Sequence, residues 1–231
     1  MRSNPTRSAF IIIDMENGFI SPESAHCIAG ARATVPACGR ALEAARRKGI
    51  PVFFVKRIYR GDGSDVELTR YEGWQSGGRA MRPASRGLNG ADVPEELRPQ
   101  PGDYTIIKPR WSAFFGTELD LILRRLGVRT VILAGTTTPN CVRTTCYDAN
   151  ALDYNVVVVE DCCSSQTEDI QRANITDMAR MGALIMSESE FESYDETTVE
   201  DMAEVIRERE ARNGFMPEPF DEHSAGWPDL W

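Results

Sequence analysis

The chain has 231 residues, of which 42% are hydrophobic and 26% charged, and its formal net charge at pH 7 is −9. This composition is typical of a folded α/β domain, and the acidic charge argues against a nucleic-acid surface and would repel an anionic membrane. Because no apolar run has the length of a membrane span and residues 1–8 lack a signal-peptide core, we expect a cytoplasmic protein with free thiols.

The two histidines and six cysteines restrict the metal chemistry that is open to this chain. His26 and His223 are too few for a multi-histidine site, and the cysteine spacings contain no CxxC pair. We therefore expect no metal ion and no cofactor.

The first half of the chain predicts three strands, one helix and one long irregular segment. Continuous apolar runs predict strands over residues 8–14, 51–57 and 104–108. Apolar residues at helical spacing predict a helix that is capped by Thr34 and ends at Gly49. Residues 15–28 are predicted to form a loop. Residues 59–101, rich in Gly, Pro and Arg, are predicted to be a solvated loop, with a lid over a pocket as the alternative.

The second half alternates strands and helices. A capping box at Thr117 and Asp120 predicts a helix that ends at Gly127, and a second box at Thr198 and Asp201 predicts a last helix up to residue 212. Between these helices the sequence predicts strands over 130–134, 155–161 and 183–186, and helices over 142–154 and 167–181.

This alternation predicts one α/β domain over residues 1–231, in which helices cover both faces of a doubly wound, mostly parallel six-stranded sheet. It ends in an irregular tail, 213–231, that carries two Trp and two Phe. So much apolar surface packs either on its own domain or on a neighbouring subunit; we favour the neighbouring subunit, and hence a homo-oligomer.

Three reactive side chains, Asp14, Lys108 and Cys141, are placed at the C-terminal ends of predicted strands. In an open parallel sheet these ends share one edge, where ligands bind. A thiolate can attack a carbonyl, a carboxylate can accept and return the thiol proton, and an ammonium lowers the thiol pKa. The backbone N–H groups of Thr137 and Cys141 could receive the developing oxyanion. Taken alone, Cys141 fits a buried structural thiol equally well; the three residues together favour hydrolysis.

Three stretches resemble the isochorismatase-like cysteine hydrolases: IIIDMENGF at 11–19, KPRWSAFFGT at 108–117 and GTTTPNCVRTTCYDA at 135–149. They occur in matching order, and the resemblance extends over residues 8–186. It implies a catalytic triad of Asp14, Lys108 and Cys141, an oxyanion hole at the amides of Thr137 and Cys141, and a cis peptide bond between Thr136 and Thr137. It also implies a six-stranded parallel sheet and an oligomer, a dimer or a tetramer.

The resemblance implies hydrolysis of a small acyclic amide, ureide or carbamoyl compound through a thioester on Cys141, with release of ammonia or an amine. A nicotinamidase is an alternative, although the Asp-x-His and further His that hold a metal in those relatives are missing here. An alternative of another class is a non-catalytic protein of the same fold that binds a small molecule or acts as a scaffold. Phe19, Trp111 and Phe114 are candidate pocket walls, with packing in the core as the alternative.

Overall fold

The computed structural model describes residues 7–87 and 90–214, which belong to two compact units, Met1–Val199 and Glu200–Trp231. The described part of the second unit contains helix α8 (Met202–Asn213). It is capped by Asp201, whose side chain accepts hydrogen bonds from the amides of Ala203 and Glu204. The expected cap at Thr198 is wrong, because this hydroxyl accepts a hydrogen bond from the amide of Asp195 instead. The single domain stays a prediction, and tail residues 215–231 lie outside the described residues.

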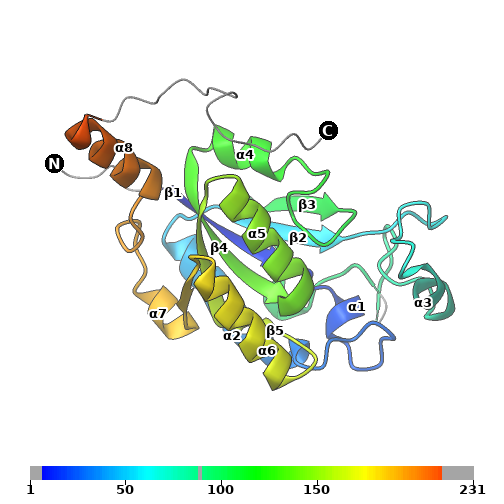
Figure 1. The fold of residues 1–231 in the computed structure, drawn as a ribbon. Coiled ribbons are helices and arrows are strands. Elements are labelled where there is room, and N and C mark those ends of the chain that lie inside the picture. The colour runs from blue at the N-terminus through cyan, green and yellow to red at the C-terminus, as the bar shows by residue number, and fades with distance from the viewer. Residues whose placement is uncertain (1–6, 88–89, 215–231) are drawn as a thin grey trace, which may run out of the picture. The chain divides into compact units, whose positions relative to one another are not determined.

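The first unit is built on a six-stranded, all-parallel sheet (Figure 1) with the strand order β3-β2-β1-β4-β5-β6. This confirms the predicted fold class. The chain winds outward from β1 to β3, returns to form β4 beside β1, and winds outward again to β6. The order therefore reverses between β1 and β4, and a crevice at such a reversal is the usual ligand site of open α/β sheets. The strands are β1 (Arg7–Ile13), β2 (Val52–Arg57), β3 (Tyr104–Lys108), β4 (Val128–Thr136), β5 (Asn155–Ser164) and β6 (Leu184–Met186).

Two apolar clusters, one on each face of the sheet, pack the strands against the helices. In β1, Phe10 and Ile12 belong to one cluster while Ile11 and Ile13 belong to the other, as strand alternation requires. Helices α2 (Ala31–Arg47) and α7 (Glu188–Glu192) pack on the first face, and α4 (Leu119–Arg125), α5 (Arg143–Ala151) and α6 (Glu168–Arg180) on the second. Within the described residues, no helix is long and apolar enough to cross a membrane.

Helix starts are where the sequence-based predictions fail most often. Helix α2 begins at Ala31 rather than after Thr34, whose hydroxyl donates to the carbonyl of Ala31 inside the first turn. The Thr117 hydroxyl donates to Ala113 O, and the N-cap of α4 is Glu118, so the expected capping box is not formed. The segment expected to be a loop at 15–28 contains the short helix α1 (Asn17–Ile20). In the first two cases the threonine hydroxyl donates to a backbone carbonyl three or four residues earlier in the chain.

The segment 59–101 is more ordered than a solvated loop. Tyr59, Trp74 and Met81 are buried in a third apolar cluster together with Phe19, and the Trp74 indole donates to Ala80 O at 2.8 Å. Helix α3 (Tyr71–Ser76) and a 3₁₀ turn (Glu95–Leu97) lie within this segment. The first half of the segment, residues 59–81, is therefore a small packed unit beside the carboxyl ends of the strands.

Candidate active site

The side chains of Asp14 and Lys108 meet at the edge of the sheet where the strands end. Asp14 follows β1 with a φ of 52°, Lys108 is the last residue of β3, and β2 lies between these two strands. Both side chains are buried, and Lys108 Nζ donates to Asp14 Oδ2 at 2.7 Å and to the carbonyl of Arg110 at 3.0 Å. The ammonium therefore holds the carboxylate in one orientation, with the other oxygen, Oδ1, left without a hydrogen-bond partner in the described structure.

Cys141 is brought to the same edge by the turn that follows β4. Gly135 has a φ of 113°, and a β-carbon there would lie 2.1 Å from Ile13 O, so only glycine lets β4 and β1 approach this closely. The Thr136–Thr137 peptide bond is cis, as the resemblance implied. A π-helical turn (Thr138–Val142) then leads into α5 and places Cys141 in its last half.

Hydroxyl groups fix this turn to the neighbouring strand and loop. The side chains of Thr137 and Thr138 donate to Ser164 O, at the end of β5, at 3.1 and 3.0 Å. Thr145 donates to Cys141 O at 2.7 Å and accepts from the amide of Ala113 at 2.9 Å. The position of the thiol is therefore set by contacts to two separate segments.

Besides Lys108, a second buried cation, Arg57, lies near the site and contacts the thiol. Arg57, the last residue of β2, is the register partner of Lys108 and is fully buried, and its Nη2 lies 3.7 Å from Cys141 Sγ. Its Nη1 donates to the Glu67 carboxylate and to the Tyr59 hydroxyl, and this hydroxyl donates to Glu67 at 2.8 Å. Glu67 and Tyr59 thus orient a guanidinium toward the sulfur.

Burial and the charge of Asp14 raise the pKa of the Cys141 thiol, while Lys108 and Arg57 act in the opposite direction. The neutral thiol is therefore favoured in the free protein at pH 7, although the sequence led us to expect a nearby ammonium to lower the thiol pKa. The physical reason is that complete burial penalises the anion more than the nearby cations stabilise it. Asp14, which lines the same pocket as Cys141, is a carboxylate that could accept the thiol proton.

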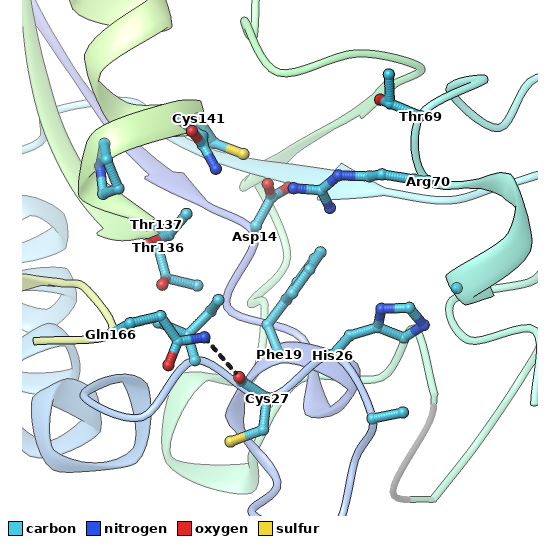
Figure 2. Close-up of a pocket in the computed structure, with 15 residues that line it drawn as sticks. Asp14, Phe19, His26, Cys27, Thr69, Arg70, Thr136, Thr137, Cys141 and Gln166 are labelled. Carbon is cyan, nitrogen blue, oxygen red and sulfur yellow. Dashed lines mark hydrogen bonds between the residues drawn. The ribbon is translucent and has the colours of Figure 1, made fainter. Parts of the chain in front are cut away.

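A pocket of about 430 Å³ opens onto Asp14 and Cys141. Figure 2 shows Asp14, Phe19 and Arg70 pointing into the space below Cys141, with Thr136 and Thr137 on the opposite wall. Of the three predicted walls, Phe19 lines the pocket. Trp111 and Phe114 are not among the residues that line it: Trp111 is 36% exposed, and Phe114 stacks on Tyr154 with ring centres 5.8 Å apart.

Sequence reasoning did not identify four charged residues near the site: Glu16, Arg57, Glu67 and Arg70. Arg57 could have been found, because it ends a predicted strand at the same edge as Asp14. Glu16 is fully buried, and burial together with the charge of Asp14 raises the pKa of its carboxyl group well above its usual range. Glu67 and Arg70 carry no local signal. In the part of the chain that the structure describes, no group of three His, Cys, Asp or Glu side chains is placed to hold a metal ion.

Comparison with known proteins agrees with this geometry, since the model of the isochorismatase domain matches residues 8–190. The chain belongs to the isochorismatase family. A protein of Arabidopsis thaliana, named a probable inactive nicotinamidase, is 40% identical to this chain, and the match covers 76% of this chain and 89% of that protein. A ureidoacrylate amidohydrolase of Azorhizobium caulinodans is 31% identical over 73% of this chain and 81% of its own length.

A crystal structure of N-carbamoylsarcosine amidase from Thermoplasma acidophilum superposes with a TM-score of 0.64, at 32% identity over 79% of this chain and 97% of that one. The family and these relatives confirm the predicted hydrolase class at the level of the isochorismatase family. They also confirm the resemblance that the three sequence stretches indicated.

Proposed function

We propose that this chain hydrolyses the C–N bond of a small acyclic amide, ureide or carbamoyl compound through a thioester on Cys141. One observation carries the proposal: the Asp14 carboxylate and the Cys141 thiol line one pocket of about 430 Å³, and the Lys108 ammonium donates to that carboxylate at 2.7 Å. A volume of this size suits a small metabolite.

Acylation begins when Asp14 accepts the proton of the Cys141 thiol as the sulfur attacks the substrate carbonyl carbon. The new C–S bond places a negative charge on the carbonyl oxygen, which the backbone N–H groups of Thr137 and Cys141 receive. When the tetrahedral intermediate collapses, the C–N bond breaks and Asp14 returns the proton to the departing nitrogen. Ammonia or an amine leaves, and the acyl group stays on Cys141 as a thioester.

Deacylation repeats these steps with water as the nucleophile. Asp14 accepts a proton from the water as its oxygen attacks the thioester, and the proton then returns to the departing sulfur. Lys108 remains protonated throughout and holds the Asp14 carboxylate by the 2.7 Å hydrogen bond. No histidine takes part, which agrees with a chain that has only His26 and His223.

The relatives support C–N hydrolysis, because the ureidoacrylate amidohydrolase and the N-carbamoylsarcosine amidase are named for ureide and carbamoyl substrates. One relative favours a second function. The 40% identical Arabidopsis protein is named a probable inactive nicotinamidase, and a non-catalytic protein that binds a small molecule in the same pocket is the corresponding alternative.

A screen for ammonia release over linear amides, ureides, carbamoyl amino acids and nicotinamide tests the proposal. We expect turnover of at least one linear compound, its loss in Cys141→Ala, and an acyl adduct on the Cys141 peptide in mass spectra of enzyme quenched during turnover. Cys146→Ala is the matched control, since this buried thiol lies one turn further along α5 and outside the pocket lining. Full activity in Cys141→Ala, or an adduct on another cysteine, would overturn the mechanism. Binding without turnover would support the non-catalytic alternative.

A further inference from the structure

Arg70 is a cation of the pocket that has no polar side-chain partner among the described residues. It lines the pocket together with Asp14 and Cys141, it is half-buried, and its guanidinium makes no hydrogen bond or ion pair with any described residue. Figure 2 shows its side chain extending from its own segment toward Asp14 and Cys141. Arginines with this surplus of donors recognise planar anions, above all carboxylates, through two parallel hydrogen bonds.

No other side chain among the described residues that line the pocket supplies an anion that is free to pair with Arg70. Among the described residues that line it, the one carboxylate is Asp14, which is already paired with Lys108 at 2.7 Å. His26 also lines the pocket, but burial and the charge of Arg70 lower the pKa of its imidazole, so it is neutral at pH 7. Cys27 and Gln166 offer no charge, and the Gln166 amide donates to the carbonyl of Cys27 at 3.0 Å.

The backbone places Arg70 securely for such a role. Its amide donates to Glu67 O at 2.8 Å, and its carbonyl accepts from the amide of Trp74 at 2.8 Å in the first turn of α3. Glu67 and Trp74 are both buried. The residue is therefore attached on both sides to the packed unit of residues 59–81, and its side chain alone remains free to meet a ligand.

Because the chain is acidic, a cation in the pocket would favour the binding of an anionic substrate. A protein with a net charge of −9 repels small anions at long range, and a cation in the pocket offsets this repulsion where the substrate binds. The two named amidase relatives act on compounds that carry a carboxylate by name, an acrylate and a sarcosine.

From these observations we infer that Arg70 binds a substrate carboxylate, so that the enzyme selects amides and ureides that bear an acid group a few bonds from the scissile C–N bond. The inference rests on the proposed function and narrows its substrate class. Asp14 and Cys141 would act on the carbonyl end of such a molecule, while Arg70 holds its opposite end. A neutral amide would leave the guanidinium without an anion and lose that orientation.

Matched substrate pairs test this selectivity. N-carbamoylglycine, 3-ureidopropionate and succinamate are each compared with the analogue in which an isopropyl group replaces the carboxylate. We expect wild-type kcat/KM to favour the acid of at least one pair, and Arg70→Gln to lower the acid-to-neutral ratio about 10- to 100-fold, the range for one lost charge-assisted contact. Arg70→Lys should restore part of the ratio. Arg60→Gln is the matched control, because Arg60 is an exposed arginine of the same segment outside the pocket lining.

A binding measurement separates this inference from the proposed function. Titration calorimetry of the three acids against Cys141→Ala needs no turnover, and the affinity of at least one should fall in Arg70→Gln/Cys141→Ala but not in Arg60→Gln/Cys141→Ala. If Cys141-dependent turnover exists but the acid-to-neutral ratio is the same in Arg70→Gln, the inference is refuted and the proposed function stands. If no compound is turned over, Arg70-dependent binding of an acid still supports the inference, and binding that ignores Arg70 overturns it.

Discussion

Arg57 offers the sharpest test of how Cys141, the proposed nucleophile, is activated. Its guanidinium lies 3.7 Å from Cys141 Sγ and stabilises the thiolate against the penalty of burial. The informative change is Arg57→Met combined with Glu67→Gln, because Arg57→Met alone would leave the Glu67 carboxylate buried without its cation. Replacing both members of a buried ion pair often costs little stability, whereas removing one member costs about 3–5 kcal/mol.

The magnitude follows from the distance. Two unit charges 3.7 Å apart attract by about 4.5 kcal/mol at an effective dielectric constant of about 20, which corresponds to about three pKa units. This is an upper limit, because the guanidinium charge is delocalised and Glu67 offsets part of it. Loss of the pair removes a cation from beside the anionic form of the thiol. The pKa of Cys141 should therefore rise further above its ordinary value.

The pH dependence of iodoacetamide alkylation measures this shift, with the Cys141 peptide quantified by mass spectrometry. Cys27 is an internal reference, since it lines the same pocket without an arginine contact in the described structure. We expect the Cys141 midpoint to move to higher pH in the double variant while the Cys27 midpoint stays in place. Arg60→Met controls for the loss of an exposed arginine. An unchanged Cys141 midpoint in a variant with an unchanged melting temperature would refute the role of Arg57.

Three further predictions concern the scaffold and its assembly. Gly135→Ala should destabilise the fold by about 3 kcal/mol and lower the melting temperature by about 6–12 °C, because the new β-carbon would clash with Ile13 O. Gly61→Ala is the control, because a β-carbon at Gly61 would meet no atom within 4 Å. Equal melting temperatures for the two variants would contradict the prediction. Prolonged EDTA treatment should leave the hydrolysis rate unchanged, and a loss that zinc restores would show the metal-independent mechanism to be wrong. Light scattering should give an oligomer for the whole chain and a smaller species without residues 213–231; a monomeric whole chain would contradict both expectations.

The sequence by itself determined the sheet and its reactive edge. Apolar runs such as residues 8–14 and 130–134 identify buried parallel strands, because such strands must be hydrophobic on both faces. Once the strands are known, chain direction alone places Asp14 and Lys108 at one edge, and the turn before α5 brings Cys141 to it. This placement needs no knowledge of side-chain packing, because the C-terminal ends of all strands in a parallel sheet lie at the same edge.

Only the tertiary structure decided what surrounds these groups. The contact between Arg57 and the thiol depends on Glu67 and Tyr59, which reach it from a segment whose composition suggested a solvated loop. Arg70 enters the pocket because that segment packs around Trp74, and no local pattern predicts such a contact. The pKa of Cys141 likewise depends on the sum of burial and three neighbouring charges. Strand direction is a property of the local chain, whereas burial, pairing and charge are properties of segments that meet only after folding.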